Sequence, residues 1–383
     1  NPSDDRRRKP WTQQQQTLPD TNLQVYSIHE DYRLDPYNYI RILATTKGDL
    51  NASLYCNYLT EESASATKAT RIEIWAENWI DFNRDNNHNP NLLSCQIPEG
   101  KVQLHLSSKP CDVSKGTFVY AKASSDRKSA KPSRKNKIAV CVKPLNFLQD
   151  ISKRLMEWIE INKILGATHF VFYVNKVHPN VRRTLKLYTT SDRKFKIINY
   201  TNLGGWEIWQ KRKNEILAYN HCFYSSLDQV DFVLPVDIDE IVVPRVHYRW
   251  QELIQTLPSG YASYSARNAF YFLPNILSNQ TFFRQTFNRS DFSPLGESGK
   301  SFISTKNALT VFNHYALHIL RPGISRTHFI PESLAQMNHY RAKCPEDLMP
   351  DCLKYTSSQF FDDIILKYKN IFEFNYSSMK RYL

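Results

Sequence analysis

The stretch from Phe232 to Pro244, FVLPVDIDEIVVP, constrains the fold of this chain more than any other. An apolar run leads directly into the carboxylates Asp237, Asp239 and Glu240, and the chain then becomes apolar again. Such a run is typical of a strand buried in a parallel sheet. Because side chains alternate along an extended segment, Asp237 and Asp239 would point to the same side. The alternative, a solvated acidic turn, fits the apolar flanks less well.

The two aspartates predict a divalent metal site. Open α/β sheets bind ligands at the carboxyl ends of their strands, where these residues would lie. Paired carboxylate oxygens suit Mg²⁺ or Mn²⁺, and either ion can in turn hold a diphosphate. An Asp-x-Asp pair by itself is common, so the rest of the chain decides whether this interpretation holds.

Predicted strands and helices alternate ahead of this stretch. This alternation predicts an α/β fold with a parallel sheet and right-handed crossovers. Gly166 would end the first helix. No glycine-rich phosphate loop follows a strand, which argues against a dinucleotide-dependent oxidoreductase or a P-loop enzyme. The predicted elements are strands over residues 138–142, 169–174, 195–200 and 232–236, and helices over residues 152–165, 181–188 and 212–225.

The sequence ahead of residue 138 has a different pattern. From Leu23 onward, short runs with a period near two lie between turn residues, which predicts a small β-sandwich-like domain. A segment rich in Lys, Arg, Ser and Pro then marks a linker. The predicted organisation is a disordered polar stem over 1–22, the β-sandwich-like domain over 23–123, the basic linker over 124–136 and the α/β domain over 137–383.

The formal net charge of +13 does not indicate a nucleic-acid partner. Much of the excess lies in two runs, residues 6–9 and 127–137, and neither is interleaved with base-stacking aromatic residues. Flexible solvated segments explain both runs better, and no nucleic-acid-binding motif occurs.

The cysteines and glycosylation sequons indicate a secretory, oxidising compartment. The chain has 7 Cys without a CxxC pair, which argues against a zinc site. No apolar run of about 18 residues occurs, so no membrane span is expected within the chain. The chain is interpreted as the lumenal part of a protein whose amino-terminal anchor lies outside it. The Asn-x-Ser/Thr sequons are at Asn51, Asn199, Asn279, Asn288 and Asn375.

Disulfides are expected between cysteines that lie in the same region of the chain. Cys141 and Cys222 lie in apolar stretches and are interpreted as buried thiols. An odd number of cysteines leaves at least one unpaired within a single chain, and Cys111 is the hardest to assign. The expected pairs are Cys56–Cys95 and Cys344–Cys352.

The chain carries a series of short motifs between about Lys137 and Arg341. They are VCVKPL at 140–145, EWIE at 157–160, LGATHFVFY at 165–173, NHC at 220–222, DIDE at 237–240, VP at 243–244 and NHYR at 338–341. Their order and spacing resemble glycosyltransferase family 92. The β-rich region ahead of them is also similar to that of animal members.

The resemblance implies a GT-A fold, a Rossmann-like fold of nucleotide-diphospho-sugar transferases, preceded by a smaller β-rich domain. It implies an inverting β-1,4-galactosyltransferase that uses UDP-galactose together with Mn²⁺ or Mg²⁺. Animal members act on fucose of N-glycan cores and plant members extend galactan, so the expected acceptor is fucose or galactose of N-glycans. For the full-length protein, the expected location is the Golgi lumen, as a single-pass type II membrane protein.

The family pattern also assigns roles to individual residues. Asp237 and Asp239 would contact the metal and the diphosphate, and His339 would be the third protein ligand of the metal. Where many members have Gly-Gln before the long helix, this chain has Asn214-Glu215, so the resemblance does not carry over the details of sugar recognition. The residues implied for donor binding at strand ends are Lys143, Tyr173 and Asn175, with Lys306 near the phosphates.

An inverting transfer needs a base within reach of the acceptor hydroxyl. The segment 306–321 resembles a family segment that contains a lysine and a pair of histidines, and this favours His314 near the acceptor. The candidates that follow the metal strand are Glu297, His314, His318 and Glu332.

Two other functions compete with this interpretation. A lectin-like protein could keep the fold without the reaction, although Asp237, Asp239 and His339 are all present. A phosphodiesterase or nuclease could use the carboxylates as a metal site, but the sequons and the lack of a second acidic cluster argue against it. Hydrolysis of UDP-galactose, or transfer from it, in the presence of Mn²⁺ would distinguish the enzyme from the lectin. The sequence does not predict an oligomeric state.

Overall fold

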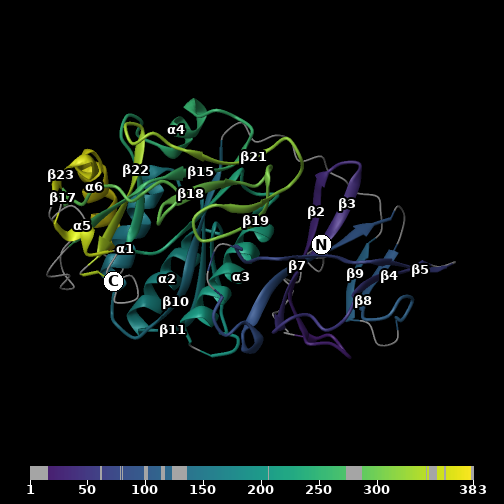
Figure 1. Cartoon of the computed structure of the whole chain (residues 1–383). Helices are drawn as coiled ribbons and strands as arrows, with labels where there is room; N and C mark the ends of the chain where they lie inside the picture. The colour runs from purple at the N-terminus through teal and green to yellow at the C-terminus, as the bar shows by residue number, and fades with distance from the viewer. Residues whose placement is uncertain are drawn as a thin grey trace, which may run out of the picture. The chain divides into compact units, whose positions relative to one another are not determined.

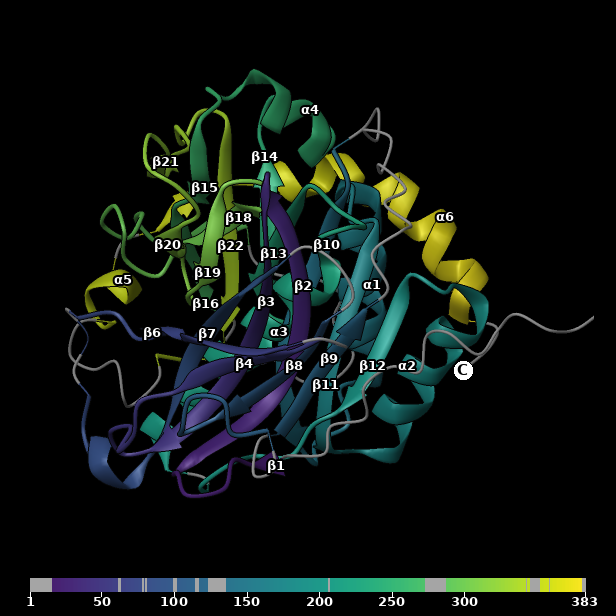
Figure 2. The same ribbon diagram turned by 90° about the vertical axis from the view of Figure 1, so that its right-hand side faces the viewer.

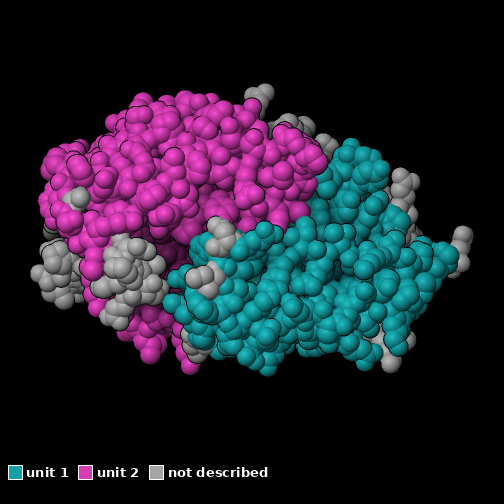
Figure 3. Space-filling model, viewed as in Figure 1, with its two compact units in different colours: residues 1–131, 202–225 teal, residues 132–201, 226–383 magenta. Residues whose placement is uncertain are grey.

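The computed structural model describes most of the chain after residue 15. The described residues are 16–60, 63–77, 79, 81–98, 102–113, 117–122, 136–205, 207–272, 287–341, 343–344, 352–357 and 359–380. The predicted stem over 1–22 lies mostly, and the basic linker over 124–136 almost wholly, outside them. The chain divides into two compact units, which Figure 3 colours separately. Unit 1 comprises residues 1–131 and 202–225, and unit 2 comprises residues 132–201 and 226–383.

Unit 2 is built on a seven-stranded sheet with the strand order β12-β11-β10-β13-β18-β15-β21. Figure 1 labels β10, β11, β15, β18 and β21 of this sheet. The strands from β12 to β13 in this order are parallel, and β18 pairs antiparallel with β13. The α/β class is therefore confirmed, and a strand lies at each place where the alternation predicted one. The strands are β10 (Ile138–Phe147), β11 (His169–Val177), β12 (Phe195–Asn199), β13 (Phe232–Val236), β15 (Tyr261–Ala266), β18 (Lys300–Ser304) and β21 (Ser325–Phe329).

Two helices of unit 2 follow parallel strands. They are α1 (Ser152–Leu165) and α2 (Pro179–Ser191), and α6 (Lys369–Lys380) packs beside α1 (Figure 2). α1 has the predicted limits and ends at Gly166, where φ is 121°. This positive φ favours glycine, and a Cβ at Gly166 would lie 2.1 Å from Oε1 of the Gln251 side chain, which would have to move. Leu155 and Ile159 of α1 are fully buried in the main hydrophobic core.

A second sheet of unit 2 begins directly after the acidic stretch. Its strand order is β14-β22-β16, with β14 antiparallel and β16 parallel to β22. Smaller sheets pair β17 with β23 and β19 with β20. The remaining elements of this unit are β14 (Glu240–Pro244), α4 (Trp250–Thr256), β16 (Asn268–Phe272), β17 (Asn288–Arg289), β19 (Ala308–Val311), β20 (Ala316–Ile319), β22 (Ala335–Arg341), α5 (Lys354–Ser357), β23 (Phe360–Phe361) and the 3-10 helix η4 (Ile364–Tyr368).

Unit 1 contains two sheets and one long helix. The sheet orders are β1-β2-β3-β7-β6 and β5-β4-β8-β9. The elements are β1 (Gln16–Thr17), β2 (Leu23–Leu34), β3 (Tyr37–Lys47), β4 (Tyr55–Leu59), β5 (Ala64–Lys68), β6 (Thr70–Glu73), the 3-10 helix η1 (Arg84–Asn86), β7 (His88–Ile97), β8 (Val102–Ser107), β9 (Thr117–Lys122) and α3 (Ile208–Ser226).

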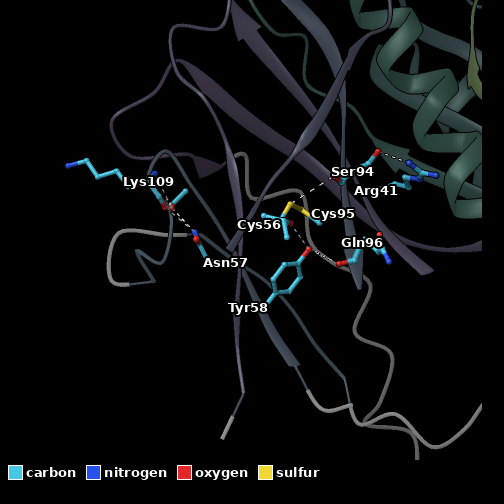
Figure 4. Close-up of a disulfide and its surroundings, with 10 residues drawn as sticks. Arg41, Cys56, Asn57, Tyr58, Ser94, Cys95, Gln96 and Lys109 are labelled. Atoms are coloured by element: carbon cyan, nitrogen blue, oxygen red, sulfur yellow. Dashed lines mark hydrogen bonds between the residues drawn. A yellow bond between two sulfur atoms is a disulfide. The ribbon is translucent and has the colours of Figure 1, made fainter. Parts of the chain in front are cut away.

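A disulfide joins the two sheets of unit 1. It links Cys56 of β4 to Cys95 of β7, and both cysteines lie in the hydrophobic core of the unit (Figure 4). A hydrogen bond beside it connects the same strands, because the Tyr58 hydroxyl donates to the carbonyl oxygen of Gln96 at 2.6 Å. The two sheets are therefore held together by a covalent and a polar link as well as by apolar packing.

Helix α3 starts earlier than the predicted range of 212–225. The Glu207 carboxylate accepts the backbone amides of Trp209 and Gln210, each at 3.0 Å, and so satisfies the free amides of the first turn. Lys213 of α3 lies 2.5 Å from Asp81, in the same unit.

In the part of the chain that the structure describes, no helix is long and apolar enough to cross a membrane.

The structure confirms both expected disulfides, Cys56–Cys95 and Cys344–Cys352. The interpretation of Cys141 and Cys222 as thiols is wrong: both are fully buried, as expected, but both are disulfide-bonded. Apolar surroundings accommodate a disulfide as readily as a thiol, so an apolar stretch could not distinguish the two. Cys111 carries a free, exposed thiol.

Candidate functional site

The acidic stretch lies where the order of the parallel strands reverses. The chain adds β11 and β12 on one side of β10 and places β13 on its other side. At such a switch point, open α/β sheets bind ligands beyond the carboxyl ends of the strands. Val142 of β10 pairs with Val236 of β13, and Lys143 and Asp237 follow them. Lys143 Nζ lies 3.7 Å from Asp237 Oδ2, so the two side chains meet at the switch.

The turn from Asp237 to Glu240 is closed by its own hydrogen bonds. The amide of Asp237 donates to Glu240 Oε2 at 2.8 Å, and the amide of Glu240 donates to the carbonyl oxygen of Asp237 at 3.1 Å. The indole of Trp158 in α1 donates to the carbonyl oxygen of Glu240 at 2.9 Å. These contacts fix the backbone that carries Asp237 and Asp239.

Strand β22 brings His339 to this turn. His339 pairs with Glu240 of β14 and with Phe270 of β16, and its ring stacks on Phe270 with centroids 5.1 Å apart. His339 Nε2 lies 3.6 Å from Asp239 Oδ2. Arg341 Nε donates to His339 Nε2 at 2.7 Å. The structure therefore brings Asp239 and His339, two of the predicted metal ligands, together with a neighbouring arginine.

Two members of the cluster have no role in the sequence-based predictions: Glu240, which appears there only as part of the acidic stretch, and Lys300. Lys300 Nζ lies 3.2 Å from Glu240 Oε2. Burial and Asp237 raise the pKa of Glu240, against the opposing effect of Lys300. The pKa of Lys300 is also raised, because Glu240 and Asp237 together outweigh burial. Lys300 is the first residue of β18, and no local sequence pattern at this position signals its role.

Asp237 and Asp239 are both held in the ionised form. Burial disfavours charge on Asp237, but Lys143 and Lys300 outweigh burial and lower the pKa of its carboxyl. Burial is likewise outweighed at Asp239, above all by His339, and its pKa lies well below the usual range. Both carboxylates therefore carry negative charge at neutral pH and can act as cation ligands.

The donor atoms fit a divalent cation that is shared with a phosphate. The described residues include no group of three or more His, Cys, Asp or Glu already arranged to hold a metal ion. Asp237 Oδ1, however, is buried without a hydrogen-bond partner, which leaves an unsatisfied anionic oxygen at the switch point. Ions such as Mg²⁺ are commonly held by one or two carboxylates plus substrate phosphates, so a preformed protein cage is not required. His339 could join them if Arg341 released its Nε2.

Among the base candidates, His314 has the closest link to the cluster. It lies between β19 and β20, and its Nδ1 is 2.7 Å from the carbonyl oxygen of Gly299, the residue before Lys300. A carbonyl oxygen can only accept, so Nδ1 carries the proton and the neutral ring has its lone pair on Nε2. Burial and the Lys300 ammonium lower the pKa of His314 to about 3, which keeps the ring neutral.

The structure does not bring the other base candidates into the cluster. Glu297 is exposed. Glu332 precedes the first residue of β22, at the opposite end of that strand from the histidine, and forms an ion pair with Arg267. His318 Nδ1 lies 2.7 Å from Thr310 Oγ1 across the β19–β20 pair.

The residues expected around the donor nucleotide lie at different places. Tyr173 and Asn175 are near the carboxyl end of β11, the parallel neighbour of β10. Tyr173 is fully buried, with its ring 5.9 Å from that of Tyr200, whereas Asn175 is partly exposed. Of these two residues, only Asn175 has surface exposed to solvent.

Lys306 is exposed in the turn after β18. Ser304 of β18 pairs with Phe232, the first residue of β13, so this turn lies at the opposite end of β13 from Asp237. The structure places Lys143 and Lys300 beside the carboxylates instead.

The family model described as Glycosyltransferase family 92 matches residues 136–381, a range that contains every residue of the cluster. No curated protein matches the chain. One similar solved structure is described as "Crystal Structure of a Mycobacterial Protein"; it is 11% identical and covers 56% of this chain and 69% of its own, with a TM-score of 0.28. This structural similarity is too low to support a conclusion about the fold.

Proposed function

Because the chain belongs to glycosyltransferase family 92, we propose that it transfers galactose from UDP-galactose onto a glycan in a metal-dependent reaction. Membership of the family makes the chain a glycosyltransferase. The proposed reaction inverts the anomeric centre on a GT-A fold and forms a β-1,4 linkage. The proposed acceptor is fucose or galactose of an N-glycan.

The observation that supports this proposal most directly is the unsatisfied oxygen of Asp237. Asp237 Oδ1 is buried at the switch point of the parallel sheet without a hydrogen-bond partner, while Oδ2 faces Lys143. A buried polar atom without a partner is rare and needs an explanation, and a bound cation supplies one here. Lys143 adds a positive charge where a diphosphate would lie.

A divalent cation would stabilise the negative charge of the leaving diphosphate. Asp237, Asp239 and His339 would hold it, and the imidazole favours Mn²⁺ over Mg²⁺. The basic residues Lys143 and Arg341 lie beside these donors, within 4 Å of Asp237 and Asp239 respectively. They keep the carboxylates ionised and oriented before the donor binds.

In the proposed reaction, the acceptor hydroxyl oxygen bonds to the anomeric carbon as the bond from that carbon to the diphosphate breaks. The hydroxyl proton passes to a base, and UDP leaves with the bonding electrons. His314 is our candidate, because the contact from its Nδ1 to Gly299 leaves Nε2 as the acceptor. A pKa of about 3 makes the ring a weak base without substrate, and a nearby diphosphate would raise it.

The test is transfer by the purified protein. UDP-galactose is supplied with fucosylated N-glycans, with galactose-terminated N-glycans or with no acceptor, each in Mn²⁺, Mg²⁺ or EDTA. We expect acceptor-dependent UDP release in Mn²⁺ that EDTA abolishes. Full activity in EDTA contradicts the metal role. Glycan binding without measurable UDP affinity supports the lectin-like alternative instead.

We also propose that the full-length protein is a single-pass type II membrane protein with this chain in the Golgi lumen. The disulfides Cys56–Cys95 and Cys344–Cys352 support an oxidising compartment. Protease protection of intact Golgi vesicles tests this location, since a cytosolic chain would be digested without detergent.

A further inference from the structure

Lys300 and Glu240 form a buried ion pair beside the candidate metal ligands. Lys300 Nζ lies 3.2 Å from Glu240 Oε2, and each side chain is only 4% exposed. The same carboxylate oxygen accepts the backbone amide of Asp237 at 2.8 Å. Glu240 therefore connects the Lys300 ammonium to the backbone of the aspartate whose Oδ1 has no partner.

The backbone on both sides of this ion pair has little freedom. A Cβ at Gly299 would lie 2.6 Å from the carbonyl oxygen of Ala266. The backbone directly before β18 therefore approaches β15 more closely than a residue with a side chain would allow. On the other side, the Trp158 indole donates to the Glu240 carbonyl oxygen at 2.9 Å. Lys300 and Glu240 are therefore presented to each other by fixed strands.

Stability alone does not explain this pair well. The loss of hydration of two buried charges offsets much of their attraction, and an apolar pair of similar volume is often as stable. The pair does, however, determine a geometry. It fixes the oxygen that accepts the Asp237 amide, and it leaves Asp237 Oδ1 without a hydrogen-bond partner.

We propose that Lys300 is a positioning residue that acts through Glu240 on Asp237 and Asp239. Lys300 holds the Glu240 carboxylate where it accepts the amide of Asp237. The turn fixed in this way orients both aspartates toward the cation and the diphosphate. This role rests on the proposed transferase function.

The first test compares the UDP affinities of three variants by calorimetry in Mn²⁺. Lys300→Met should weaken affinity roughly 10–100-fold, the range observed when a group that orients a metal ligand is removed. Lys300→Arg keeps a cation at this position and should recover most of the affinity. Lys186→Met changes an exposed lysine of α2 and should match the wild type. Equal affinity of Lys300→Met and the wild type would overturn the proposal.

A purely stabilising role predicts a different pattern. Lys300→Met would then have a lower melting temperature but an unchanged UDP affinity in its folded fraction. The double variant Lys300→Met with Glu240→Gln removes both charges of the ion pair, so neither is left buried without its partner. It therefore replaces the single variant in this test if Lys300→Met does not fold. Positioning predicts that the loss of affinity persists in the double variant, because no cation holds the side chain at position 240. Full recovery in the double variant overturns the proposal.

A second readout is independent of the proposed function. Hydrogen exchange at the Asp237 amide, measured without ligands, reports on its hydrogen bond to Glu240. We expect faster exchange there in Lys300→Met, with the amides inside β13 unchanged. Unchanged exchange at Asp237 contradicts the positioning role of Lys300 but not the transferase function. A wild-type protein that does not bind UDP in Mn²⁺ contradicts the transferase function instead.

Discussion

Glu240 and His339 face each other across the antiparallel ladder of β14 and β22, and His339 Nδ1 lies 3.8 Å from Glu240 Oε1. The same ladder brings His339 Nε2 to 3.6 Å from Asp239 Oδ2. One strand pairing thus joins the acidic stretch to a motif near the end of the chain. Substitutions in either strand should therefore change the same property, the metal-dependent binding of the donor.

Asp237→Ala and Asp239→Ala are each expected to abolish transfer while leaving the fold intact. The pKa of each carboxyl is lowered, and Asp237 Oδ1 has no hydrogen bond to lose. Activity should fall roughly 100-fold or more, the effect of removing one electrostatic stabiliser of a transition state. UDP release measures the activity, and circular dichroism checks the fold.

Asp228→Ala is the matched control, because Asp228 is exposed in the turn after α3. It should retain wild-type activity. Activity within a few-fold of wild type in Asp237→Ala or Asp239→Ala would contradict the proposed metal role of that residue.

His339→Ala should weaken only the metal-dependent part of UDP binding. Asp237 and Asp239 repel a bare diphosphate, so UDP should bind poorly in EDTA, and Mn²⁺ reverses this charge. A metal ligand acts only through the ion, and its loss should weaken UDP binding roughly 10–100-fold in Mn²⁺. Any glycan binding should be unaffected. Calorimetry in Mn²⁺ and in EDTA measures both parts.

His339→Phe separates the ring nitrogens from the stacking on Phe270. It can preserve the aromatic contact, whose centroids lie 5.1 Å apart, but provides no metal ligand. We expect the same loss of UDP affinity as in His339→Ala, with a smaller loss of stability. Equally tight UDP binding in EDTA and in Mn²⁺ by the wild type would show that no metal role exists for this residue.

Removal of the Cys56–Cys95 disulfide should cost more stability than removal of Cys344–Cys352. The sequence separations are 39 and 8, and loop-closure entropy gives roughly 4 and 2.5 kcal/mol respectively. Paired Cys→Ala variants and urea unfolding test the order. Mass mapping of non-reduced peptides is the control, because a free thiol at any of these positions in the wild type contradicts the pairing. A larger loss for Cys344–Cys352 contradicts the loop-closure explanation.

Local signals predicted the parallel part of the sheet and its helix. Helix α1 has the predicted limits because both ends depend on neighbouring residues, and Gly166 ends it with a φ of 121°. The position of Asp237 after β13 followed from the apolar run before it. These features depend on the periodicity of apolar side chains and on residues that end helices, and both can be found in a single sequence.

The long-range part of the site could not be predicted from the residues alone. The pairing of Glu240 with His339 depends on the register of two distant strands, and only the family resemblance suggested His339. The turn with Lys306 lies at the wrong end of β13 for a contact with Asp237, because β18 runs antiparallel to that strand. The same direction brings Lys300 to the site. Strand direction is a property of the sheet, and no local pattern in β18 specifies it.

His314→Gln tests the candidate base and should lower transfer roughly 100- to 10,000-fold, the usual contribution of general acid–base catalysis. Glutamine keeps a polar side chain of similar reach but cannot accept a proton at neutral pH. Substrate affinity should change little, so the loss should appear in kcat. Wild-type kcat in His314→Gln would rule out His314 as the base.

The same substitution should change how stability depends on pH. The pKa of His314 is about 3 in the folded chain and 6.5 as an ordinary value, so between these values the unfolded state binds more protons. Stability therefore falls as pH falls through this window, by up to about 1.4 kcal/mol per pH unit for this one group. His314→Gln should remove that slope, whereas His247→Gln, at a partly exposed position, should keep it. Parallel curves of unfolding free energy against pH for the wild type and His314→Gln would contradict this prediction. They would mean that His314 binds a proton as readily in the folded chain as in the unfolded one, so that folding does not keep its ring neutral.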